Sequence, residues 1–457
     1  MKRLLVLFLC LVVSWSVLAQ GSLPQNIWVG SGFFLPGWYL NAGVDLRLRY
    51  EAFEHTPQGV LGDDYSYIRF RWRPWLIFGN EGGKIYVRGA HRLHGYFDGD
   101  YGYRYPDEFI IDNLYLDLYG LFGGRVDLRV GRQDLIYGAG RVIIEGTSGD
   151  GGRSIYFDAV KAVVKLQDET TLDLFGIYND YENRLAIGNV TRDLNRYTGG
   201  NNKMREMGAG MYLKHKVSDD LATEFYYIWK RESSYLANGF IPMPRRDVHT
   251  LGTRLLPKFN ERVSGELEVA GQWGEVDDGE RIRAMMAYAG LTYKGYKINK
   301  IEPYITGSCY YMSGDDSNNG TDHRWNPLWS RYPQFHELSL YSYTPWMNNG
   351  QVDGLWRWSN IIYPALEVGF KLERGDHGSL QTGPLFADQS NGVSGKYRGW
   401  IATAKYGFPI IANLCGDEYS GRGMLSGLVY AECLFPGDYY ASDNMAWLVR
   451  LELNASF

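Results

Sequence analysis

Hydrophobic and polar residues alternate along most of this chain with a period of two. The segment 64–78 shows it clearly, with Arg69, Arg71 and Arg73 on one face of an extended strand and Ile68, Phe70 and Trp72 on the other. Successive side chains of a strand point to opposite faces, so one face here is basic and the other apolar. The pattern returns repeatedly with no amphipathic helix between. It predicts an all-β, transmembrane antiparallel barrel with lipid outside and a polar lumen inside.

Eighteen segments carry this alternation, and the connections between them alternate in length. The segments are 40–53, 65–78, 84–96, 108–119, 125–133, 155–166, 171–178, 205–217, 221–231, 247–256, 264–273, 283–294, 300–312, 361–373, 379–388, 397–409, 424–435 and 444–457. Outer-membrane barrels have short periplasmic turns and long external loops. Counting Leu338–Tyr343 as a further strand would break that alternation, so we place it in one external loop, 313–360. The sequence predicts about 18 strands of the outer-membrane type.

The N-terminus has the features of an export signal. Two basic residues precede an apolar run over 4–13, and Val17–Ala19 supplies small residues for cleavage. We expect a signal peptide over 1–19, a short periplasmic lead-in over 20–37 and a barrel over 38–457.

The export signal leads to a first testable prediction. The mature protein is expected to begin at Gln20 and to be found in the cell outer membrane. N-terminal sequencing of membrane fractions checks this, and an intact Met1 or a soluble mature form would contradict it.

The C-terminus and the composition support the same location. An aromatic last residue, Phe457, on an amphipathic strand is the signal that barrel-assembly machinery reads, so we expect that machinery and outer-membrane lipid as partners of a monomer. The counts of Tyr (36), Trp (14), Phe (20) and Gly (56) favour strands, turns and aromatic girdles. The net charge of −5 excludes a basic, nucleic-acid-binding protein at the level of the whole chain. Past the leader, Cys309, Cys415 and Cys433 could form one disulfide, with Cys415 and Cys433 the nearer pair, or stay as thiols.

The sequence offers no positive sign of catalysis. His91 and His94 are three residues apart in a predicted strand, so they face opposite sides and make no metal pair. Asp315 and Asp316 could bind calcium, but a polar turn in an external loop is the plainer interpretation. We expect no enzyme activity, no metal and no cofactor.

Basic residues gather on the predicted lumen face. They are Arg47, Arg49, Arg69, Arg71, Arg73, Arg88 and Arg92 on the first three strands, followed later by Lys161 and Lys165. Guanidinium groups bind carboxylates in a planar, bidentate way, so such a wall could guide an anion. The alternative is that these side chains pair with lumen acids, such as Asp45, Asp117, Glu224, Glu266 and Glu268, and only fill the barrel. Both can hold if some arginines stay unpaired.

Two segments, DNLYLDLYGLFGGRVDLRVGRQDLIYGAGR (112–141) and GDGGRSIYFDAVKA (149–162), resemble the alginate-export family of outer-membrane barrels. Later landmarks of its broader bacterial branch are matched by YMSGDD (311–316), NPLWSRYPQFHELSLYS (326–342) and AECLFPGDYYA (431–441). The resemblance covers most of the mature chain and implies an eighteen-stranded barrel. For the founding alginate secretion channels, it also implies passage of an anionic uronate polymer through an arginine-lined constriction.

The resemblance carries over to a few residues. Arg132, Arg153 and Asp158 match family landmarks, which adds the two arginines to the candidates for the substrate path. Arg132 is out of phase with Arg125 and Arg129, so its place requires a bend, a bulge or a position past the membrane edge. The family's late periplasmic turn can obstruct the pore, and the matching connection here, 410–423, is short.

Two functions fit these observations. The first is a passive outer-membrane channel that passes an anionic polysaccharide or another anionic solute along the arginines. The second is a structural or glycan-binding barrel without an open pore, whose loop 313–360 grips a glycan with its five tryptophans. Single-channel conductance separates them.

Overall fold

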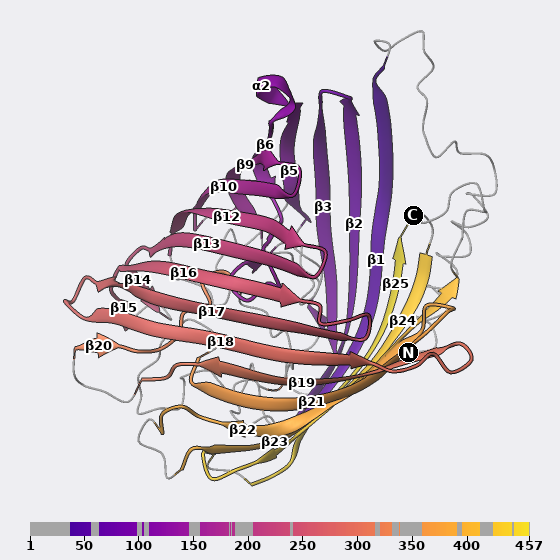
Figure 1. Ribbon diagram of the computed structural model, residues 1–457, viewed down its shortest axis with the longest axis vertical. Coiled ribbons are helices and arrows are strands. Elements are labelled where there is room, and N and C mark those ends of the chain that lie inside the picture. Colours follow the sequence, from indigo (N-terminus) through magenta and orange to yellow (C-terminus); the bar gives the residue numbers. More distant parts are fainter. Residues whose placement is uncertain are drawn as a thin grey trace.

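The strands close into a barrel in which the first strand pairs with the last (Figure 1). The computed structural model describes residues 37–55, 64–97, 103–104, 109–145, 156–181, 183, 185–187, 204–237, 241–315, 320–330, 338, 359–390, 395–411, 424–440 and 443–456. Over these residues, β1 (Tyr39–Glu54) runs antiparallel to β25 (Ala446–Ser456) and completes a closed barrel of 18 long strands. The all-β prediction and the strand count are confirmed. The predicted signal peptide lies outside the described residues.

The sixteen strands between β1 and β25 each pair with the next along the barrel. They are β2 (Tyr65–Asn80), β3 (Gly83–Tyr96), β5 (Phe109–Gly120), β6 (Val126–Gln133), β9 (Phe157–Gln167), β10 (Thr170–Asn179), β12 (Glu206–Ser218), β13 (Leu221–Glu232), β16 (Arg246–Pro257), β17 (Val263–Val276), β18 (Arg281–Lys294), β19 (Ile301–Met312), β21 (Ile361–Leu372), β22 (His377–Phe386), β23 (Tyr397–Ile411) and β24 (Met424–Pro436). Each of the eighteen predicted segments overlaps one of the eighteen long strands, because the period-two pattern is enforced along every strand that separates lipid from a polar lumen.

Short elements occupy the connections. They are β4 (Tyr103–Arg104), α2 (Leu121–Gly124), β7 (Leu135–Ile136), β8 (Ile144–Glu145), β11 (Ala186–Ile187), β14 (Tyr235–Ala237), β15 (Ile241–Met243) and β20 (Thr321–Asp322). Within the described ranges, no helix has the length and apolar character to cross a membrane.

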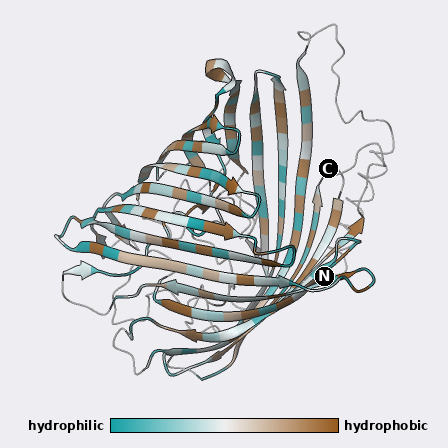
Figure 2. Ribbon diagram, viewed as in Figure 1, coloured by the Kyte–Doolittle hydropathy of each residue, from teal (hydrophilic) through white to brown (hydrophobic). Residues whose placement is uncertain are grey.

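The two faces of the barrel wall differ sharply in polarity, and the strands in Figure 2 alternate accordingly between hydrophobic and hydrophilic residues. Apolar side chains such as Val160, Leu267 and Leu366 are 42–47% exposed on the outer face. Charged side chains such as Arg47 and Glu268 are 1–2% exposed on the inner face. An arginine in the lipid would cost about 2–4 kcal/mol near the midplane. The charged face must therefore line the lumen, and the apolar face must contact the lipid.

The connections assign the two ends of the barrel. Two-residue turns at 81–82, 168–169 and 219–220 all lie at one end, which we identify as periplasmic. Longer connections, including 134–156 and 313–360, join strands at the opposite end, which is external. One external connection, 277–280, is also short, so the alternation in length is not strict.

The connection 313–360 starts and ends at the external end of the barrel, and its described part turns into the lumen. Trp325 and Trp329 are fully buried, and the Trp329 amide donates to the carbonyl oxygen of Val142 at 3.1 Å. Two tryptophans left in water would forgo the free energy gained by burying their apolar surface. Leu338 is also buried, whereas 339–358 lie outside the described residues.

Candidate functional site: the basic lumen wall and the two inward loops

Cross-strand register places arginines side by side on the lumen face of β1, β2 and β3. Arg47 lies directly opposite Arg71, and Arg71 lies directly opposite Arg92. The row ends on β25 at Asn454, which faces Arg47. Like charges directly opposite one another in a sheet are destabilising, so this row of three arginines costs stability unless anions approach it.

Several neighbouring arginines have acidic partners, as the alternative interpretation of the basic face expected. Arg73 reaches the Asp45 carboxylate at 3.7 Å, and Arg49 forms an ion pair with Glu452. The Arg69 guanidinium donates to the Tyr67 hydroxyl at 2.9 Å and lies 3.9 Å from Glu51. The lumen acids therefore neutralise part of the wall.

Arg71 differs from these neighbours. It is 3% exposed, and no hydrogen bond or ion pair engages its side chain within the described part of the chain. It lines a hollow of about 510 Å³ on the lumen side of β1, β2 and β23–β25, whose charged lining also includes Arg49, Arg73, Lys405 and Arg450 and the carboxylates of Asp45 and Glu452. A buried charge without a partner is costly, and a carboxylate in this hollow would remove the cost.

The remaining candidates on the later strands are paired. Lys161 contacts the Asp173 carboxylate at 3.1 Å, and Lys165 contacts Asp127 at 3.1 Å while staying half exposed. Arg153 lies outside the described residues.

Arg132 lies on the outward-facing register of the wall. It is directly opposite Leu114, which is 37% exposed, and Asp158, whose carboxylate it binds at 2.9 Å. Tyr156 covers it, with the guanidinium 3.6 Å from the ring centroid, and Asn183 accepts a hydrogen bond at 2.8 Å. Its place near the external end of β6 accounts for the phase difference from Arg129. We therefore leave Arg132 out of the proposed path.

The first inward loop, 134–145, follows β6 and crosses the lumen. The Arg141 guanidinium binds Glu266 and Glu268 on β17, both at 2.6 Å, and lies 3.7 Å from the ring centroid of Tyr288. Tyr137 stacks on Tyr212 at 4.7 Å between ring centroids. Arg141 was not among the predicted site residues, because a loop residue has no strand period that would indicate where it points.

The second inward loop, 320–330, packs beside the first. Lys230 on β13 donates to the carbonyl oxygen of Leu328 at 2.7 Å, and Gln272 on β17 donates to that of Asn326 at 2.6 Å. The two loops therefore cover the lumen side of β12, β13, β17 and β18. The basic row lies on another arc, from β25 to β3.

Lys405 and Arg450 were also absent from the predicted site residues. Arg450 on β25 donates to the Glu51 carboxylate on β1 at 2.6 Å. Its alternation already placed it on the polar face of the last strand. The additional signal that the sequence offers is barrel closure, which puts the last strand beside the first.

A carboxylate at the foot of the first inward loop provides a pH-dependent contact. Burial raises the pKa of Asp134 to about 6, while Arg88, with which it forms an ion pair at 3.0 Å, opposes the shift. Asp112 shares the same guanidinium at 2.9 Å, and Asn113 donates to Asp134 at 2.8 Å. Asp134 is therefore a group whose charge changes near pH 6.

Lowering the pH from 7 to 5 is expected to increase the anion preference of the pore. The folded state binds the Asp134 proton more tightly than the unfolded chain, whose aspartate pKa is about 3.9. The contribution of Asp134 to stability therefore grows as the pH falls through about 6, and the neutral form leaves Arg88 with one carboxylate fewer. Reversal potentials recorded between pH 7 and 5 measure this change in anion preference. Asp134→Asn should remove the pH dependence. If the variant keeps the same change in anion preference, Asp134 is not the group responsible.

Other groups with possible chemistry remain peripheral. Cys309 and Cys433 carry free thiols, and Cys415 lies outside the described residues. Ligand atoms of Glu54, His55 and Asp64 lie within 4.8 Å of one another at the external end of β1 and β2. Exposed groups of this kind are common without an ion, so we assign them no role.

Comparison with known proteins supports the fold and the family. The chain is similar to three Pseudomonas aeruginosa structures: OccK11 (OpdR), with 13% identity and a TM-score of 0.51; OccK5 (OpdH), with 11% and 0.53; and OccD3 (OpdP), with 7% and 0.52. The alignments cover 92%, 92% and 91% of this chain and 96%, 98% and 91% of those chains, respectively. At these identities, the likeness establishes the fold alone. Among the curated proteins, none gives a significant match.

A family model described as alginate export matches residues 38–359. The match begins at the first barrel strand and includes both inward loops, and it extends over more than half of the chain. The protein is an outer-membrane β-barrel channel, and it belongs to the alginate-export family.

Proposed function

We propose that this channel passes an anionic polysaccharide, or another anionic solute, along the arginine row of β1–β3. The observation that carries the proposal is Arg71, which is buried in the lumen wall between Arg47 and Arg92 and forms no ion pair with a carboxylate in the described part of the chain. A uronate carboxylate would offset the repulsion within this row. The family description, alginate export, names a polymer of this charge.

The surrounding acids keep binding weak enough for transit. Asp45 and Glu452 already hold Arg73 and Arg49, so an anion at Arg71 competes with fixed carboxylates nearby. Conduction requires binding favourable enough to admit the solute and weak enough to release it. A wall of partly neutralised arginines meets both requirements.

The alternative is a barrel that binds glycans without conducting. It is favoured by the two inward loops, which fill part of the lumen with buried aromatic side chains such as Trp325 and Trp329. The same burial removes these two tryptophans from the set that could stack on a glycan outside the cell.

Planar-bilayer recordings of the refolded protein test the proposal. We expect discrete conductance steps, a reversal potential on the anion side in a salt gradient, and stronger block by an oligouronate than by a neutral oligosaccharide of equal length. Absence of conductance would favour the binding barrel. Equal block by both sugars, or a cation preference, would refute the anionic path.

A further inference from the structure

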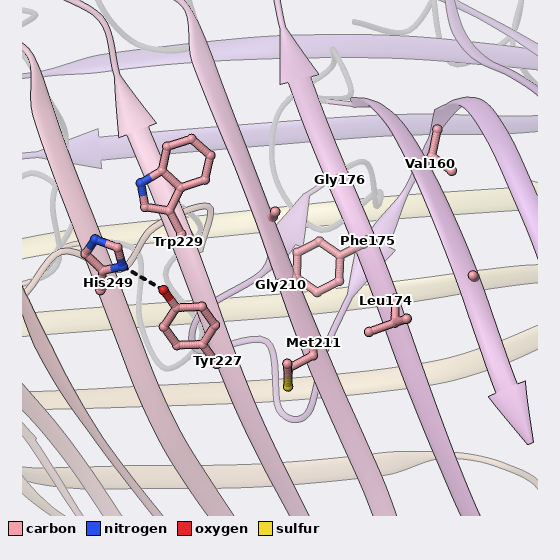
Figure 3. A pocket seen from close by; sticks show the side chains of 11 residues that line it. Val160, Leu174, Phe175, Gly176, Gly210, Met211, Tyr227, Trp229 and His249 are labelled. Atoms are coloured by element: carbon pink, nitrogen blue, oxygen red, sulfur yellow. Dashed lines mark hydrogen bonds between the residues drawn. The ribbon is translucent and has the colours of Figure 1, made fainter. Parts of the chain in front are cut away.

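A groove of about 690 Å³ crosses the outer face of the barrel between β9 and β16 (Figure 3). Gly176 has no side chain and Ala209 has only a methyl group, so these two residues leave a depression between larger neighbours. Val160, Gly176, Ala209, Trp229 and His249 lie directly opposite one another in one continuous cross-strand row. Strands are spaced about 4.8 Å apart, so the row is roughly 19 Å long.

The groove faces lipid in the external half of the membrane. Leu174 and Met211, which line it, are 41% and 48% exposed on the outer face. Val160 is the fourth residue of β9, and His249 is the fourth residue of β16; both strands begin at the external end. An occupant of the groove must therefore come from the outer leaflet.

One end of the groove is aromatic and polar. The Tyr227 hydroxyl forms a hydrogen bond with His249 Nδ1 at 2.7 Å (Figure 3), and His249 stacks on Trp273 at 5.6 Å between ring centroids. Such rings, apolar in body and polar at the edge, lie at the level of lipid headgroups. This end of the groove therefore lies at the boundary between the acyl chains and the headgroups of the lipid.

An arginine continues the row beyond these rings. Arg283 on β18 lies directly opposite Trp273, is exposed, and has no acidic partner among the residues that the structure describes. It lines a second hollow, of about 700 Å³, together with His323. The one carboxylate in that lining, Asp388, accepts a hydrogen bond from the Gly314 amide at 3.0 Å. Arginine binds phosphate in a bidentate way, so a phosphate fits this hollow.

We propose that the groove and Arg283 together seat one phosphorylated, multiply acylated glycolipid of the outer leaflet, with an acyl chain over Gly176 and a phosphate at Arg283. A second barrel fits less well, because in a two-fold interface centred on the groove the Arg283 of each copy would lie against the apolar end of the other copy's row, near Val160. The site lies on the outer face, so it is independent of the proposed transport function.

Native mass spectrometry of the detergent-solubilised barrel with hexa-acylated, bis-phosphorylated lipid A tests the proposed binding site. A Cβ at Gly176 meets no atom within 4 Å, so Gly176→Leu should fold and fill the groove. We expect it to weaken lipid A binding about tenfold, equivalent to about 1.4 kcal/mol. Arg283→Gln should have a similar effect on lipid A and little effect on the same lipid without phosphates.

Gly307→Leu is the matched control, because Gly307 is also an exposed, outward glycine of the wall with open space at its Cβ and lies outside the groove. It should bind lipid A as the wild type does. Unchanged binding in Gly176→Leu, or equally tight binding of phosphatidylglycerol by the wild type, would overturn the proposal. So would a dimer of barrels that Gly176→Leu disperses, since the groove would then hold a second copy.

Discussion

Replacing Arg71 by glutamate is expected to lower the anion-to-cation permeability ratio of the pore at least tenfold, about 1.4 kcal/mol. The substitution changes the charge by two units in the centre of the row formed with Arg47 and Arg92. It also places a carboxylate where the arginine had no ion-pair partner in the described residues, so no native ion pair is lost. Reversal potentials in planar bilayers measure the ratio. The double variant Arg69→Glu/Arg71→Glu should shift it further.

The control for this experiment is Lys258→Glu, which makes the same change of charge in an exposed turn between β16 and β17. It should fold and leave the selectivity as in the wild type. If Arg71→Glu folds and keeps the original selectivity, the arginines serve only to fill the barrel and to pair with lumen acids. The transport proposal would then lose its main support.

Replacing Arg141 by methionine is expected both to destabilise the barrel and to raise its conductance. The change leaves Glu268, which is 2% exposed, without its arginine, and removing one member of a buried ion pair costs about 3–5 kcal/mol. The inward loop 134–145 also loses its anchor on β17, so the lumen should widen. Single-channel conductance and the denaturant midpoint of the refolded protein measure the two effects.

Arg129→Met separates the two effects. Arg129 binds Asp117 at 2.6 Å and lies 3.9 Å from the ring centroid of Tyr115. The substitution therefore removes the same types of contact as Arg141→Met does, but within the barrel wall, and it detaches no loop. We expect a less stable barrel with unchanged conductance. An Arg141→Met variant with wild-type conductance would show that the loop does not limit the pore.

The sequence alone determined the barrel, its number of strands and which residues of a strand share a face. The physical reason is local: every strand separates lipid from a polar lumen, so the constraint recurs at every second residue and can be found without knowing any contact. Arg69, Arg71 and Arg73 were assigned to the lumen in this way. Arg132 was seen to be out of phase for the same reason.

Only the tertiary structure decided which charges are neutralised and where the loops go. Arg141 meets Glu268 across 127 residues, and Arg450 meets Glu51 across 399. The loop 320–330 enters the barrel because its tryptophans find an apolar surface that other strands and the first inward loop provide. These contacts join distant parts of the chain, and no periodic pattern within one segment encodes them.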